Sequence, residues 1–101
     1  MQYLLIAYDG TDPEAPSRRM AARPAHLELG AKLRDEGKLL FGIAILDGTE
    51  KMIGSMFVGE FASRAELDQW LAIEPYVTGG VWKQIEVQPC RVGPSFVKAN
   101  P

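Results

Sequence analysis

The sequence predicts an α+β domain in which two helices cover one face of a four-stranded antiparallel sheet. The chain has 101 residues, a length that suits one domain. Short apolar runs typical of strands and longer segments of helix-forming residues follow one another in the order β-α-β-β-α-β. Turn or capping residues mark the boundaries between these segments. This order is that of the split βαβ, or ferredoxin-like, arrangement.

The first half of the chain predicts a strand followed by a helix. Residues 3–8 form a compact apolar run that ends in a turn, and residues 11–13 provide capping and turn chemistry before the helix. Residues 16–36 are rich in helix formers, and Gly37 suits a left-handed cap at their end. Pro24 lies inside this segment and removes a backbone donor, so we expect the helix to kink or restart there.

The middle of the chain predicts a β-hairpin. Two apolar runs, 39–46 and 51–61, are joined by the short polar link 47–50. The first of these runs is apolar on both alternating faces, whereas two helices can cover only one face of a sheet. We therefore expect a homodimer that packs sheet on sheet. The alternative is a monomer whose C-terminal tail folds across the second face.

The last third of the chain predicts a second helix and a final strand. Ser63 and Glu66 form a capping box before a helix over residues 65–73. This helix ends before Pro75, because the residue preceding a proline is driven out of the helical region. Residues 81–92 alternate in part and are expected to form the last strand.

Composition narrows the class of protein and its partners. With 47% hydrophobic and 24% charged residues, we expect residues 1–101 to form one folded domain with a loose tail from about residue 94. The net charge is −2 and the basic residues are scattered, which argues against nucleic acid as a partner. No apolar run approaches the roughly 18 residues of a membrane span, and no signal peptide is evident. A cytoplasmic protein is expected, with its single cysteine, Cys90, as a packing thiol.

His26 is the only histidine, so any proton transfer near neutral pH that needs an imidazole depends on it. It shares a helix face with Leu29 and Leu33, where a histidine is more often a hydrogen-bonded core residue. No second histidine is present and Cys90 stands in no ligand spacing, so we expect no metal. The Gly79-Gly80 pair lacks the Lys-Ser/Thr of a phosphate loop, and no dinucleotide fingerprint occurs, so no cofactor is expected either.

Several charged residues have both a functional and an ordinary interpretation. Glu74 precedes Pro75, where a rigid turn can present a carboxylate, although a lone glutamate at a helix end is usually solvated. Arg18, Arg19 and Arg23 lie at helical spacing and could bind an anion, although a solvated helix face is the commoner outcome.

Two segments resemble a known family. RRMAARPAHL, residues 18–27, closely resembles the RR-x-x-x-RPAHL segment of the YCII-related (YciI-like) family, and EPYVTGGV, residues 74–81, is similar to its DPYVxAGV segment. The resemblance implies a dimeric ferredoxin-like α+β barrel and a cleft that holds a His-Asp pair proposed as catalytic. Most members are of unknown function. The family is related in fold to muconolactone isomerases, and one member is a dehydrochlorinase of chlorinated hydroxyquinols.

Carried over by position, the resemblance implies that His26 is the catalytic histidine. Glu74 occupies the acidic position, where the family usually has aspartate. Arg18, Arg23 and Tyr76, which lie in the same two segments, are the expected substrate-binding residues. A carboxylate within reach of the ring would fix its tautomer and favour the imidazolium.

Two functions from different classes remain open at this stage. The first is a small cofactor-independent enzyme of the lyase or isomerase type, in which His26 is the general acid/base for a small cyclic or aromatic substrate. The second is a non-catalytic dimeric module that binds a small ligand or supports an assembly. A polar pocket beside His26 would favour the enzyme, whereas a ring sealed by Leu29 and Leu33 would favour the module. If Glu74 is not the partner of His26, Asp68 or Asp9 is the next candidate.

Overall fold

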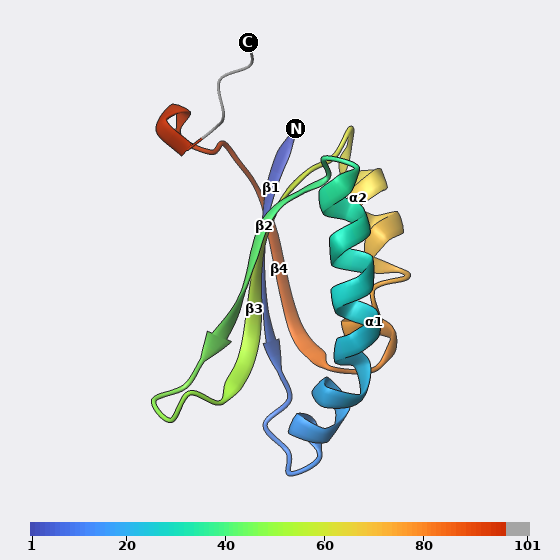
Figure 1. The fold of residues 1–101 in the computed structure, drawn as a ribbon, viewed down its shortest axis with the longest axis vertical. Coiled ribbons are helices and arrows are strands. Elements are labelled where there is room, and N and C mark those ends of the chain that lie inside the picture. Colours follow the sequence, from blue (N-terminus) through green and yellow to red (C-terminus); the bar gives the residue numbers. More distant parts are fainter. Residues whose placement is uncertain (97–101) are drawn as a thin grey trace.

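The computed structural model describes residues 1–96. The sheet contains β1 (Gln2–Asp9), β2 (Leu39–Leu46), β3 (Met52–Glu60) and β4 (Trp82–Cys90). Its order is β2-β3-β1-β4, with every neighbouring pair antiparallel. The helices α1 (Ala15–Asp35), α2 (Arg64–Leu71) and α3 (Pro75–Thr78) lie on one face of the sheet (Figure 1). The predicted ferredoxin-like fold is confirmed. None of the described helices is long and apolar enough to span a membrane.

Helix α1 begins and ends as local chemistry dictates. Gly37 adopts φ +76°, and the amides of Gly37 and Lys38 donate to the carbonyls of Arg34 and Leu33. These two bonds form the Schellman cap that the glycine predicted. The expected restart at Pro24 is wrong, because α1 runs without interruption from Ala15 to Asp35. A single missing amide inside a helix of 21 residues leaves the flanking turns able to hold it together.

The second helical segment differs from the expectation. Ser63 accepts a hydrogen bond from the Glu66 amide at 3.2 Å, which confirms the predicted cap of α2. Helix α2 ends at Leu71 rather than at residue 73. After Glu74 the chain begins a further short helix, α3, which the sequence reasoning did not predict because Pro75 was interpreted only as the end of a helix. Proline is equally suited to the first position of a new helix.

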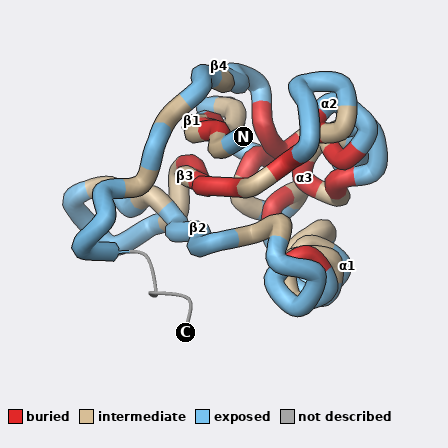
Figure 2. Tube along the Cα trace, turned by 90° about the horizontal axis from the view of Figure 1, so that it is seen from above, coloured by how far each residue is buried: buried red, intermediate tan, exposed pale blue. Residues whose placement is uncertain are grey.

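The core lies between the sheet and the three helices, where the buried residues gather (Figure 2). Strand β1 shows why: Tyr3, Leu5 and Ala7 alternate toward the helices and are buried. Much of the core is aromatic, and Trp70 stacks on Phe57 with ring centroids 4.5 Å apart. Trp70 belongs to α2 and also contacts Glu74, so this aromatic cluster adjoins the region that contains Glu74.

The opposite face of the sheet is apolar and exposed. Phe41, Ile43 and Leu46 of β2 are 47%, 50% and 50% exposed. A groove of about 1210 Å³ runs along this face and ends at Phe96, in the short 3₁₀ turn η1 (Pro94–Phe96). Of the expected tail, residues 97–101 lie outside the described part of the chain. Along β2 this face remains exposed in the described part of the chain.

Candidate active site

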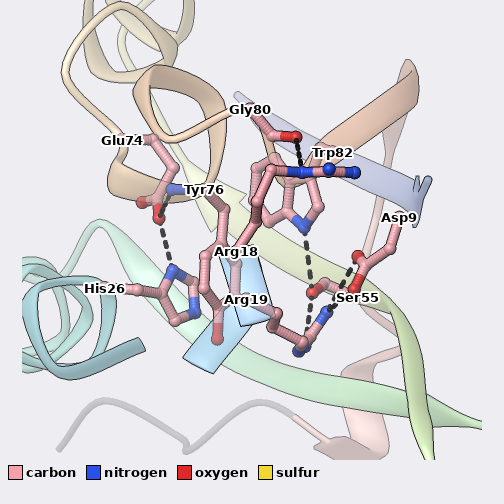
Figure 3. Close-up of polar contacts among 9 residues, drawn as sticks. All are labelled: Asp9, Arg18, Arg19, His26, Ser55, Glu74, Tyr76, Gly80 and Trp82. Carbon is pink, nitrogen blue, oxygen red and sulfur yellow. Dashed lines mark hydrogen bonds and ion pairs between the residues drawn. The ribbon is translucent and has the colours of Figure 1, made fainter. Parts of the chain in front are cut away.

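The structure brings His26 and Glu74 into direct contact. His26 lies on α1 and Glu74 immediately precedes α3, 48 positions later, and Nδ1 of the imidazole donates to Oε1 of the carboxylate (Figure 3). An ionised carboxylate only accepts hydrogen bonds, so we assign the proton of this contact to Nδ1. The His26 side chain is 24% exposed and that of Glu74 is 2% exposed. The pair therefore has a buried acid and a ring that reaches the surface.

Local sequence explains where the Glu74 carboxylate points. Because Pro75 follows, Glu74 is extended (φ −65°, ψ 122°) and caps α3, accepting the Tyr76 amide at Oε1 over 3.2 Å. Trp70, four residues earlier and on α2, donates its indole Nε1–H to Oε2 over 3.1 Å. Together with His26, these groups supply three N–H donors to one buried carboxylate. This satisfies a group whose burial would otherwise be unfavourable.

The Tyr76 ring supports the imidazole. The two rings stack with centroids 3.8 Å apart and an interplanar angle of 11°. The Arg19 guanidinium lies over the same tyrosine, 4.7 Å from its centroid, and Figure 3 shows the Tyr76 ring between His26 and Arg19. Burial raises the pKa of the Tyr76 hydroxyl above its ordinary value of 10.0, an effect that the positive charges of Arg19 and Arg23 oppose. Tyr76 therefore stays a neutral hydrogen-bonding group at physiological pH.

A buried ion pair between Arg19 and Asp9 holds the guanidinium against the Tyr76 ring. Arg19 Nη1 donates to both carboxylate oxygens of Asp9, over 2.9 and 3.0 Å, and their side chains are 4% and 5% exposed. Arg19 Nη2 and the Trp82 indole both donate to Ser55 Oγ, over 3.1 and 3.2 Å. This network joins α1 to β1, β3 and β4. It fixes the guanidinium in its position against the Tyr76 ring.

The two arginines expected to bind substrate, Arg18 and Arg23, have different surroundings. Arg18 pairs with both carboxylate oxygens of Asp12, over 2.6 and 2.8 Å, and its Nε–H donates to the Gly80 carbonyl over 3.2 Å. The guanidinium holds the pKa of Asp12 well below its ordinary range. Arg18 thus ties the start of α1 to the loop before β4, and its role in substrate binding stays a prediction.

Arg23 is half-buried and takes part in none of the ion pairs among residues 1–96. It lies four residues after Arg19 and three before His26, so the three side chains follow one face of α1. Its charge acts on the Tyr76 hydroxyl. Arg23 is therefore a cation close to the ring pair and available to an anionic group.

The alternative partners of His26 are engaged elsewhere. Asp9 binds Arg19, and Asp68 accepts from Arg64 Nε over 3.0 Å on the exposed side of α2. Leu29 and Leu33 do not seal the imidazole, since it remains 24% exposed. Within residues 1–96, no group of three or more His, Cys, Asp or Glu side chains is placed to hold a metal ion.

A cavity of about 750 Å³ opens where β1, β3 and β4 meet the start of α1. Asp9, Lys51 and Lys83 are among its lining residues, whereas His26 and Glu74 are not. The cavity is connected to the His26–Glu74 pair through Asp9, which binds Arg19, and through Tyr76, which packs between Arg19 and His26.

Sequence reasoning missed two contributors to the site. Trp70 stands four residues before Glu74, but no role in the site was predicted for it. Asp9 was expected only as an alternative partner of His26, and nothing local in the sequence links it to Arg19. Its partner is ten positions away, on the next element.

Comparison with known proteins identifies the family and the fold of the chain. The YCII-related domain profile matches residues 1–91. Protein YciI of Escherichia coli is 34% identical over 95 residues, covering 88% of this chain and 95% of that protein. Among solved structures, 5-chloro-2-hydroxyhydroquinone dehydrochlorinase from Burkholderia phenoliruptrix, in complex with 2,5-dihydroxybenzoquinone, superposes with a TM-score of 0.81 at 22% identity, covering 94% of this chain and 98% of that one.

A dimeric ferredoxin-like protein of unknown function from Jannaschia has a TM-score of 0.52 at 18% identity, covering 90% of this chain and 98% of that one. At these identities the solved structures establish the fold, while the domain profile and the YciI relative establish descent. The chain belongs to the YCII-related family.

Proposed function

We propose that the protein is a small cofactor-independent enzyme of the lyase or isomerase type, with His26 as its general acid/base. The observation that carries the proposal is the contact between His26 Nδ1 and Glu74. With Nδ1 protonated and engaged, the free lone pair of the neutral ring lies on Nε2. The buried carboxylate fixes the ring orientation and stabilises the imidazolium that forms when Nε2 takes a proton.

The chemistry suited to this arrangement is proton abstraction next to a carbonyl or ring hydroxyl. Nε2 takes either the proton of a C–H next to a carbonyl, whose bonding pair moves toward the carbonyl oxygen to form an enolate, or the proton of a ring O–H, whose pair stays on oxygen as a phenolate. In an isomerase the imidazolium returns the proton to another carbon. In a lyase the electron pair expels a leaving group from the substrate, and the proton passes to solvent.

Tyr76 and Arg23 are the proposed substrate-binding residues. The neutral Tyr76 hydroxyl can donate a hydrogen bond to the developing oxyanion, and Arg23 can pair with its charge. Small cyclic or aromatic compounds bearing hydroxyl or carbonyl groups suit these two contacts. The likeness to a dehydrochlorinase solved with 2,5-dihydroxybenzoquinone supports this class of substrate.

The proposed assembly is a homodimer that packs sheet on sheet. The exposed side chains of β2 and the apolar groove beside them give each chain a large uncovered surface. The dimeric ferredoxin-like neighbour supports this arrangement. A symmetric pair of such faces buries the apolar side chains of both copies.

The test is a turnover screen of the pure protein against lactones, chlorinated and unchlorinated hydroxyquinols, and quinones. His26→Gln is the control, because the amide keeps a polar side chain of similar reach but is not a base. Turnover that falls about 10²–10⁴-fold in His26→Gln supports the enzyme. Binding of one of these compounds without turnover, and equally well by both proteins, supports the non-catalytic module instead.

A further inference from the structure

We infer that Trp70 is a positioning residue for the His26–Glu74 pair: its indole N–H holds the carboxylate in the orientation that fixes the tautomer of His26. The inference rests on the proposed function, to which it adds a residue. It requires no contact between Trp70 and the substrate. The observation behind it is the hydrogen bond from Trp70 Nε1 to Glu74 Oε2.

The orientation of the Glu74 carboxylate is fixed because its hydrogen-bond donors bind both of its oxygens. The Tyr76 amide and His26 Nδ1 both donate to Oε1, whereas the Trp70 indole donates to Oε2. Rotation of the carboxylate about its Cγ–Cδ bond would break the contacts at both oxygens together. Without the indole donor, Oε2 is buried without this partner and the group can turn to seek another.

The indole is itself held rigidly. Trp70 is 5% exposed and stacks on Phe57 and Phe61, with centroids 4.5 and 5.9 Å away, and its edge meets Trp82 at 6.5 Å. These aromatic residues lie on the sheet or directly after one of its strands, whereas Glu74 precedes α3. The hydrogen bond from Trp70 therefore fixes the orientation of the carboxylate relative to the aromatic core. A second-layer partner of this kind sets the geometry of a catalytic group without touching the substrate.

A purely structural role is the alternative, because a buried tryptophan N–H usually finds some acceptor. The two roles differ in what they do to His26. If Trp70 only fills space, replacing its N–H changes stability and leaves the imidazole unchanged. If it positions Glu74, the same replacement alters the tautomer of His26.

The experiment compares Trp70→Phe with Trp82→Phe, each alone and together with Glu74→Gln. Both variants replace a buried indole with a benzyl ring and remove one Nε1 donor, but the Trp82 donor goes to Ser55, and the Trp82 ring contacts His26 directly, with centroids 6.1 Å apart. The tautomer ratio of neutral His26 is measured from its ring ¹⁵N chemical shifts. We expect Trp70→Phe to lower the preference for the Nδ1–H tautomer about tenfold, as loss of one charge-assisted hydrogen bond implies.

In a Glu74→Gln background the added Trp70→Phe change should have no further effect, because Trp70 is linked to His26 through the carboxylate. An effect of Trp82→Phe should persist in that background, because it arises from direct contact with the imidazole. An unchanged ratio in Trp70→Phe, or an effect of Trp70→Phe that persists beside Glu74→Gln, would overturn the inference.

A measurement on the unmutated protein covers the case in which Trp70→Phe does not fold. The Trp70 indole ¹H resonance should shift with pH as His26 titrates, because both side chains donate to the Glu74 carboxylate. A Trp70 resonance that does not move through this titration would also overturn the inference. Neither measurement needs turnover. If the His26 tautomer depends on Trp70 but the protein shows no activity, the proposed function is wrong and the inference about Trp70 still holds.

Discussion

Arg19→Met tests the buried hydrogen-bond network that holds Arg19 against Tyr76. The substitution keeps an unbranched side chain but removes the guanidinium that binds both oxygens of Asp9 and one donor to Ser55. It also removes the cation from the face of Tyr76. Asp9, only 5% exposed, would be left in the core without its counter-ion.

The expected loss follows from that burial. Removing one partner of a buried ion pair destabilises a protein by about 3–5 kcal/mol, well above the 0–1 kcal/mol of a surface pair. Ser55 keeps its bond from Trp82, so little is added there. A domain has about 5–15 kcal/mol of stability in total, so Arg19→Met should lose a large part of it.

Urea denaturation followed by far-ultraviolet circular dichroism measures the free energy of unfolding. The double variant Arg19→Met with Asp9→Asn is the decisive comparison, because it removes the stranded charge as well. It should recover about 2 kcal/mol relative to Arg19→Met alone. A loss below about 1 kcal/mol for Arg19→Met, or no recovery in the double variant, would refute the claim that the pair is desolvated.

Three further predictions concern assembly, ionisation and the shape of α3. Light scattering at micromolar concentration should give twice the mass of one chain, and Ile43→Lys on the exposed sheet face should give monomer or aggregate; a monomeric unmutated protein would exclude the dimer. Because burial raises the pKa of Tyr76, stability from its neutral form is fully present below about pH 10 and is lost as the pH rises through the higher pKa of the folded state. In a spectrophotometric titration, the tyrosine hydroxyl that ionises at the highest pH should therefore be missing in Tyr76→Phe; if it persists there, the raised pKa does not belong to Tyr76. Gly79→Ala should unfold at lower urea, because its Cβ would lie 2.8 Å from the Pro75 carbonyl oxygen, whereas Gly48→Ala, with no atom within 4 Å, should not; equal midpoints would contradict this steric account.

Local signals explain how much of the fold the sequence could predict. Gly37 and Ser63 determine helix ends through their own backbone and side chain, and both ends formed where expected. The restart considered at Pro24 did not occur, and the helix that begins at Pro75 was not predicted, because proline has two outcomes: it can be tolerated inside a long helix, and it can begin a new one. Neighbouring turns and packing decide which occurs, and neither is visible in a single local pattern.

The candidate site divides in the same way. The contact of His26 with Glu74 was expected from two segments that resemble one family, because position in a shared fold brings distant residues together. The pairing of Asp9 with Arg19 and of Trp70 with Glu74 could not be deduced from composition or periodicity. Each depends on how α1 and α2 sit on the sheet, which is a property of packing.

Exchange of substrate protons with D₂O tests the central claim, that His26 Nε2 accepts a proton from the substrate. Proton NMR follows the ring C–H signals of hydroxyquinol with the unmutated protein, His26→Gln and Glu74→Gln. We predict that the unmutated protein accelerates exchange, that His26→Gln abolishes the acceleration while the compound still binds, and that Glu74→Gln reduces it. Equal acceleration by His26→Gln, or bound hydroxyquinol whose protons exchange no faster than in buffer, would contradict the account.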